Sequence, residues 1–213
     1  NTRASWGRLV YHGTGRERGE RMLRKKRMDY SRGDGHWLGD GIYLYKDKLN
    51  VFRWINLKFK ELYPKEKTDN ELYKKYMILE VSLKVEEDRM FSLLNPESWI
   101  EFNCAKEKAQ EKAAYAKRLN AVKITDGVIL NIMFNNLGYR DFYDVVVGVF
   151  PLEKNSASET RFNGLNELQY CVKNPDIIVS LRECTQEFEY DIYKKKLNQY
   201  YGYRNRNNCK YKG

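Results

Sequence analysis

Four residues with chemically useful side chains stand at three separated points of the sequence. His12 closes a short apolar run and is followed by Gly13 and Thr14. Tyr43 comes 31 residues after His12, and Glu167 and Gln169 stand together in the last third of the chain. Imidazole, phenol and amide groups can hold hydroxyl groups by hydrogen bonds, whereas a carboxylate can also offset a developing positive charge.

The residues around each position predict the element that carries it. Arg8–His12 is apolar and β-prone, and Gly13-Thr14-Gly15 predicts a tight turn that ends this strand. Gly33–Gly41 is dense in glycine, which indicates positive φ values or a close approach of the backbone to something bound. Ile42–Tyr45 then predicts a strand. Because side chains alternate along a strand, Glu167 and Gln169 are expected on one face, with Leu168 and Tyr170 opposite.

The rest of the chain predicts a mixture of strands and helices. Gly127–Phe134 fits a strand or a helix equally well. Because strands and helices do not alternate regularly, we expect an α+β fold and not a doubly wound parallel sheet. The further strands are expected at Tyr76–Leu83, Phe142–Leu152, Gln169–Val172 and Ile177–Leu181, and the helices at Glu20–Met28, Val51–Tyr63 and Ala105–Leu119.

Composition narrows the class of protein. The 213 residues are 42% hydrophobic and 32% charged, which excludes a wholly disordered chain and a fibrous one. No apolar run is long enough to cross a bilayer, and residues 1–6 show no signal peptide, so a cytoplasmic protein without a membrane partner is expected. Four cysteines without a Cys-x-x-Cys pair, and only two histidines, predict reduced thiols and no metal site.

Two common phosphate-binding motifs are absent from the sequence. Gly13-x-Gly15-x-x-x-Gly19 is one residue too long for the dinucleotide fingerprint, and no Gly-Lys-Ser/Thr of a phosphate-binding loop occurs.

The order of the motifs resembles the ADP-ribosyltransferase superfamily. The similar segments are Tyr11-His12-Gly13-Thr14, Gly39-Asp40-Gly41-Ile42-Tyr43-Leu44 and Glu167–Val172, and they are typical of the branch with a His–Tyr–Glu triad, which includes the poly(ADP-ribose) polymerases. The resemblance extends over about residues 8–182. It implies one ADP-ribosyltransferase-like domain over residues 1–199, built as a split antiparallel β-sandwich with flanking helices. Residues 200–213 would then form a basic, aromatic C-terminal tail.

The resemblance also implies a role for each residue in binding NAD as a co-substrate. His12 would bond an adenosine-ribose hydroxyl, and the backbone of Gly13, with Thr14 beside it, would hold the nicotinamide amide. Tyr43 would stack on the nicotinamide ring, and Trp54 would close the stack. Each position also has a structural alternative, since a strand-end histidine, a sheet tyrosine and a helix tryptophan commonly serve packing.

The late strand leaves the catalytic residue open between Glu167 and Gln169. The family pattern of an acidic residue before an aromatic-aliphatic-Val run aligns at least as well from Gln169 as from Glu167. In the family, loss of this glutamate accompanies transfer of a single ADP-ribose, so the resemblance predicts mono-ADP-ribosylation.

The acceptor is predicted from charge. A formal net charge of +10 and the basic cluster of Arg24, Lys25, Lys26 and Arg27 favour a nucleic acid, with RNA ahead of DNA. The resemblance to toxin-type relatives implies a toxin or antiviral defence effector, with an antitoxin or inhibitor protein as a possible partner. A protein side chain is the alternative acceptor, and a non-catalytic nucleic-acid-binding module is the alternative class. Release of nicotinamide separates the enzyme from the module.

Overall fold

A computed structural model describes residues 5–33, 35–64, 69–116, 124–151, 166–184, 186 and 189–199 of the chain. It divides the chain into two compact units. The first unit comprises Asn1–Val10, Met28–Lys46 and Ser82–Ser180, and the second comprises Tyr11–Arg27, Asp47–Val81 and Leu181–Gly213. A single domain over residues 1–199 stays a prediction, and the tail at 200–213 lies outside the described residues.

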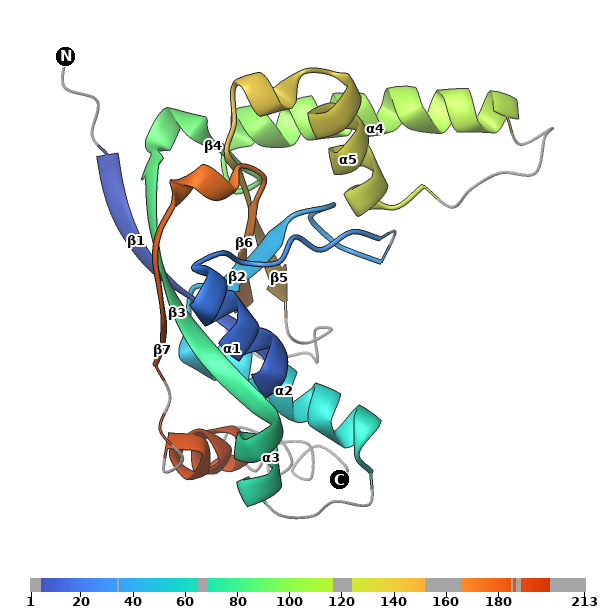
Figure 1. Cartoon of the computed structure of the whole chain (residues 1–213). Helices are drawn as coiled ribbons and strands as arrows, with labels where there is room; N and C mark the ends of the chain where they lie inside the picture. The colour runs from blue at the N-terminus through green and yellow to red at the C-terminus, as the bar shows by residue number, and fades with distance from the viewer. Residues whose placement is uncertain are drawn as a thin grey trace, which may run out of the picture. The chain divides into compact units, whose positions relative to one another are not determined.

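The strands of the described residues form one sheet of mixed direction (Figure 1). Their order is β4-β5-β6-β2-β1-β3-β7. The β5–β6 and β2–β6 pairs are antiparallel, whereas the β4–β5 pair is parallel. The expectation of an antiparallel sheet is therefore wrong for the β4–β5 pair. The expected mixture of sheet and helices is confirmed, and the split sandwich stays a prediction. The strands are β1 Ser5–Gly15, β2 Ile42–Tyr45, β3 Tyr76–Glu86, β4 Met90–Ser92, β5 Val145–Pro151, β6 Asn166–Val172 and β7 Ile178–Glu183.

Helices lie at all three places where the sequence predicts them, although the first spans Arg16–Lys25 and not Glu20–Met28. The structure also decides the segment that the sequence left open. Gly127–Phe134 is helical and lies in α5, where the Thr125 hydroxyl caps the helix by accepting from the Val128 N–H. The helix expected from Ala105 begins earlier, because Pro96 suits a first helical position and the Asn95 side chain accepts from the Glu97 N–H. The helices are α1 Arg16–Lys25, α2 Lys48–Leu62, α3 Asp69–Lys75, α4 Pro96–Ala116, α5 Asp126–Asn136 and a further helix at 189–199.

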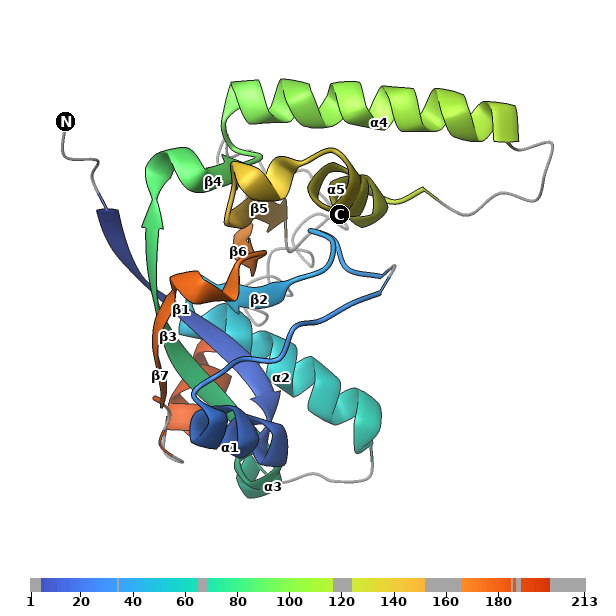
Figure 2. The ribbon, with the colours of Figure 1, turned by 45° about the horizontal axis from the view of Figure 1, so that its top comes forward.

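In the first unit, α4 and α5 pack side by side against one face of β5 and β6 (Figure 2). Burial of these apolar side chains is the main favourable contribution to folding here. Tyr43 and Phe150 are partly buried and contact this core. Its fully buried members are Leu38, Phe91, Phe102, Ile129, Leu130, Met133, Phe134, Val146 and Cys171.

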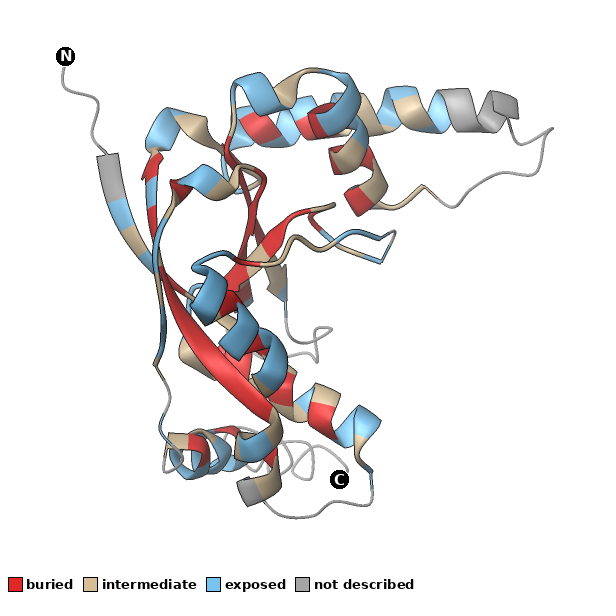
Figure 3. Ribbon diagram, viewed as in Figure 1, coloured by how far each residue is buried: buried red, intermediate tan, exposed pale blue. Residues whose placement is uncertain are grey.

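In the second unit, α2 packs on the end of β1. The predicted turn at Gly13-Thr14-Gly15 is wrong, because β1 continues to Gly15 and α1 begins at the next residue. Gly13 instead allows close packing, since a Cβ there would lie 2.8 Å from Val51 Cγ1 and 3.0 Å from Ile55 Cγ1. Much of β3 is buried, whereas the outer face of α1 is exposed (Figure 3).

Candidate functional site

Tyr43 of β2 is fixed by both sides of its hydroxyl group. The Tyr43 oxygen accepts from the Leu38 N–H at 2.9 Å and donates to the Gly39 carbonyl at 2.7 Å. The His36 ring lies 5.3 Å from the Tyr43 ring, centroid to centroid. Burial raises the pKa of Tyr43 well above its usual value, so the phenol stays protonated at neutral pH. The loop before β2 and the tyrosine therefore hold one another in place.

A buried lysine ties the same loop to β6. Lys173 is 3% exposed, and its Nζ atom donates to the carbonyls of Leu38 at 2.7 Å and Asp40 at 2.6 Å. The Lys173 Nζ atom also lies 5.2 Å from the centre of the Phe134 ring. Burial lowers the pKa of Lys173. Lys173 is not among the residues predicted from the sequence, where its one signal is its place directly after the apolar run of β6.

The predicted positive φ values are confirmed at Gly33 and Gly39, and the close approach that the structure shows is to other parts of the chain. Gly39 has a φ of +72°, and a Cβ on it would lie 2.5 Å from Asn131 Oδ1 of α5. A Cβ on Gly127 would overlap the His36 carbonyl oxygen, and one on Gly41 would overlap Cys171 Sγ. The loop is thus pressed against both α5 and β6.

Glu167 and Gln169 lie on the face of β6 that also carries Cys171, the residue paired with Tyr43 of β2. In the β2–β6 register Tyr43 pairs with Cys171 and Tyr45 with Gln169, so these side chains point to the same side. Gln169 Nε2 donates to Glu167 Oε1, which confirms the prediction that the two side chains lie on one face. Glu167 is 2% exposed and Gln169 5% exposed. Removal of water strengthens any interaction that the carboxylate makes with a positive charge.

The remaining residues of the expected NAD site belong to the second unit. His12, Gly13 and Thr14 lie near the end of β1, where Gly13 and Thr14 are buried and His12 is half-buried. Trp54 is a half-buried residue of α2, beside the core face of that helix. The structure therefore brings Tyr43, Glu167 and Gln169 onto one face of the first unit, and the other four residues lie in the second unit.

The predicted basic cluster lies on the surface of the second unit. Arg24, Lys25, Lys26 and Arg27 are all exposed, at the end of α1 and just beyond it. Arg16, at the start of the same helix, is engaged within the fold, because its guanidinium donates to the Tyr73 and Tyr76 carbonyls. Arg16 is therefore less available to a partner than the four exposed cations at the end of α1 and just beyond it.

The described residues also bear on metal binding, membrane insertion and the state of the cysteines. No group of three His, Cys, Asp or Glu side chains within them could hold a metal ion. No helix in the described part of the chain has the length and apolar character to cross a membrane. Cys104, Cys171 and Cys184 are free thiols, and Cys209 lies outside the described residues.

Comparison with known proteins gives one informative match. No family model and no solved structure matches the chain. The uncharacterized protein MJ0359 of Methanocaldococcus jannaschii is 34% identical over 188 residues, which cover 81% of this chain and 85% of the archaeal protein. Identity at this level over most of both chains shows common descent, and the chain belongs to the same family as MJ0359.

Proposed function

We propose that the protein is a mono-ADP-ribosyltransferase that cleaves NAD, releases nicotinamide and transfers ADP-ribose to a nucleic acid. RNA is favoured over DNA as the acceptor, and a toxin or defence effector is the role that fits such an activity. The order of the strands carries the proposal. The three strands with the motif residues, β6 with Glu167 and Gln169, β2 with Tyr43 and β1 with His12, are consecutive in the sheet.

The face shared by Tyr43 and Glu167 suits the chemistry of NAD cleavage. The bond between ribose C1′ and nicotinamide breaks, and nicotinamide leaves with the bonding electron pair. The ribose then carries oxocarbenium-like positive charge until the acceptor attacks C1′ and loses its proton. A carboxylate aimed at this charge stabilises the transition state. Glu167 is the only anion of β6, and its bond from Gln169 holds the carboxylate in one orientation.

The fixed tyrosine supports a second part of the proposal. A planar nicotinamide ring needs a rigid aromatic face if the bond to be broken is to be aligned. Tyr43 meets this requirement, because both hydrogen bonds of its hydroxyl go to the backbone of Leu38 and Gly39. The exposed cluster Arg24–Arg27 would attract the phosphates of the acceptor.

Nicotinamide release from NAD tests the proposal directly. The purified chain is incubated with NAD alone and with RNA, DNA or protein pools, and both free nicotinamide and labelled acceptor are measured. We expect His12→Ala to abolish most NAD turnover without unfolding the protein. Tyr43→Ala should also abolish it, but at a lower melting temperature, because Tyr43 contacts the core and bonds the backbone of Leu38 and Gly39. Full activity in either variant would remove that residue from the site.

The acceptor pools separate the alternatives. Labelling of protein but not of RNA or DNA would assign a protein side chain as the acceptor. Salt-dependent RNA binding without any nicotinamide release would instead identify a non-catalytic binding module and overturn the proposal.

A further inference from the structure

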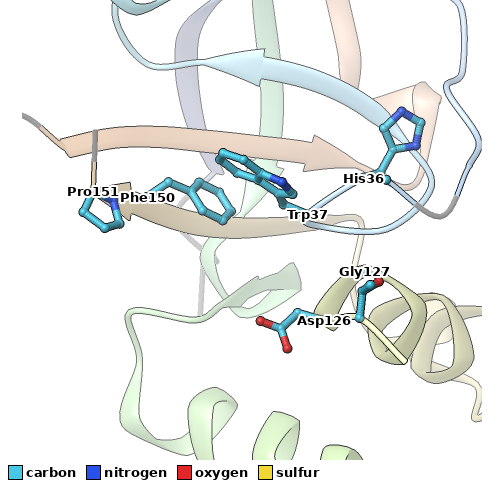
Figure 4. A pocket seen from close by; sticks show the side chains of 8 residues that line it. His36, Trp37, Asp126, Gly127, Phe150 and Pro151 are labelled. Atoms are coloured by element: carbon cyan, nitrogen blue, oxygen red, sulfur yellow. The ribbon is translucent and has the colours of Figure 1, made fainter. Parts of the chain in front are cut away.

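The first unit contains a cavity of about 510 Å³ between its glycine-dense loop and α5 (Figure 4). The rings of Trp37 and Phe150 form one wall, and Asp126 and Gly127, from the first turn of α5, lie across from them. Pockets of several hundred Å³ hold ligands of the size of a nucleotide. The cavity is therefore large enough for one nucleobase with its sugar.

Trp37 is exposed although the backbone around it is fixed. The residue is 58% exposed, and its ring centroid lies 4.7 Å from that of Phe150. The Gly39 N–H donates to the His36 carbonyl, and both backbone groups of Leu38 are bonded, to Tyr43 and to Lys173. Exposing a tryptophan to water costs free energy that burial would recover. A rigid aromatic surface held open in this way is suited to a flat ligand.

The opposite wall determines which part of a nucleotide fits the cavity. The Asp126 carboxylate points into the space below the two rings (Figure 4). Its Oδ1 atom accepts from Lys106 Nζ at 2.9 Å. The pair with Lys106 offsets the charge of this carboxylate, and its second oxygen can accept a hydrogen bond from the exocyclic amine of a base. A base therefore suits this wall of the cavity.

The cavity is linked to the candidate catalytic residue through the sheet. Phe150 of β5 pairs with Glu167 of β6 in an antiparallel register. Side chains of directly opposed residues lie on one face, with their Cβ atoms about 5 Å apart. A ring stacked beside Phe150 would therefore lie on the same face of the sheet as the Glu167 carboxylate.

We propose that the cavity lined by Trp37, Phe150 and Asp126 binds an unpaired base of the single-stranded nucleic acid that accepts ADP-ribose. The base stacks on the two rings, and its exocyclic amine donates to Asp126. The net charge of +10 supplies attraction for the strand outside the cavity. This inference rests on the proposed function in one respect, that the bound nucleic acid is the acceptor of ADP-ribose. The binding of a base does not itself require transferase activity.

Binding of fluorescein-labelled 12-residue RNA and DNA strands, measured by anisotropy without NAD, tests the cavity. Trp37→Ala should weaken binding roughly fivefold to a hundredfold, the range that loss of one base–aromatic stack produces. Trp37→Phe should retain most of the affinity because a ring remains. Trp99→Ala is the matched control: Trp99 is 50% exposed, contacts Phe102 in α4, and should leave binding unchanged.

Homopolymers test the carboxylate. Wild-type protein should prefer adenine and cytosine strands over uracil strands, because only the first two bases carry an exocyclic amine. Asp126→Asn should reduce this preference several-fold, because a neutral amide attracts the amine less than a carboxylate does.

Three results would overturn the inference: wild-type protein that binds no strand, Trp37→Ala that binds as wild type does, or equal losses in Trp37→Ala and Trp99→Ala. Nicotinamide release separates this failure from failure of the proposed function. Base binding without NAD cleavage would leave the cavity assigned and remove the transferase. If NAD is cleaved and Trp37→Ala labels the acceptor as wild type does, the transferase is retained and the cavity is no longer assigned to the acceptor.

Discussion

The segment 36–43 and the basic end of α1 show two ways in which a surface can be prepared for a ligand. In segment 36–43 the backbone from Leu38 to Asp40 is held by hydrogen bonds to the Tyr43 hydroxyl and to Lys173 Nζ. At the end of α1, Arg24–Arg27 are exposed, and Lys26 ends the helix in the left-handed conformation with a φ of 48°. Chemistry on a sugar needs groups held to a fraction of an ångström, whereas attraction of a phosphate chain needs only charge near the surface. Substitutions in the two regions should therefore change different measurements.

The largest effect is expected at the face that Tyr43 shares with β6. Glu167→Gln should lower nicotinamide release about a hundredfold to a thousandfold, because it removes an aimed charge. Gln169→Ala should lose less, because the carboxylate remains and only its bond from Gln169 Nε2 is removed. Single-turnover nicotinamide release and acceptor labelling are measured for both variants.

The ranking of the two variants decides the assignment. A larger loss in Gln169→Ala would put Gln169 at the family position and leave Glu167 with a structural or acceptor-side role. A residue that serves only the acceptor should spare nicotinamide release and reduce labelling alone.

The next largest effect is expected from the lysine that ties the loop. Lys173→Met leaves the buried carbonyls of Leu38 and Asp40 without their donor, and should lower the free energy of unfolding by about 2 kcal/mol or more. The exposed Lys84→Met in β3 is the control and should change it by less than about 0.5 kcal/mol. Urea unfolding measures both.

The pH dependence sharpens this prediction. Burial lowers the pKa of Lys173 in the folded protein, so the unfolded chain binds more protons between the folded pKa and the usual 10.5. Stability contributed at this position therefore rises with pH through that window. Wild-type protein should gain stability relative to Lys173→Met as the pH approaches 10.5. A difference that is constant with pH would show that Lys173 keeps its ordinary pKa.

A smaller effect on stability is expected from an ion pair outside segment 36–43. Arg89 donates to both oxygens of Asp144, at 2.5 and 2.9 Å, and this bond lowers the pKa of Asp144. Its stabilisation is present above the usual carboxyl pKa and is lost as the pH falls through the lowered one. Asp144→Asn should cost about 1–2 kcal/mol in urea unfolding at pH 7, and the difference should shrink toward pH 2. If this variant also slowed nicotinamide release in fully folded protein, Asp144 would contribute to the candidate site as well as to stability.

The smallest effect is expected at the basic cluster, and it should be greatest at low salt, where charges are least screened. Charge reversal of Arg24, Lys25 and Lys26 should weaken acceptor labelling and flatten its dependence on salt, because fewer counterions are released. Nicotinamide release without acceptor should stay near the wild-type rate. Reversal of the exposed Lys194, Lys195 and Lys196 matches the change in charge, and an equal effect there would show that net charge alone attracts the acceptor.

Local patterns along the sequence determined most of the elements and the pairing of two candidate residues. The apolar spacing of Val51–Tyr63 predicts α2, and the alternation of side chains predicts that Glu167 and Gln169 share a face. Such patterns reflect interactions between residues that are near in the sequence. For the same reason they misplaced a turn at Gly13, which is extended because α2 packs against it.

The tertiary structure alone decided which residues hold the site in place. Nothing near Lys173 in the sequence reveals that its Nζ atom reaches the carbonyls of Leu38 and Asp40, about 135 residues earlier. The helical state of Gly127–Phe134 follows from its Thr125 cap together with its packing, since its apolar run alone fits either element. Trp37 and Phe150 become one aromatic wall only when β5 and the loop before β2 meet in the fold. Contacts at this separation are set by packing and burial of the whole chain, and short-range residue patterns do not encode them.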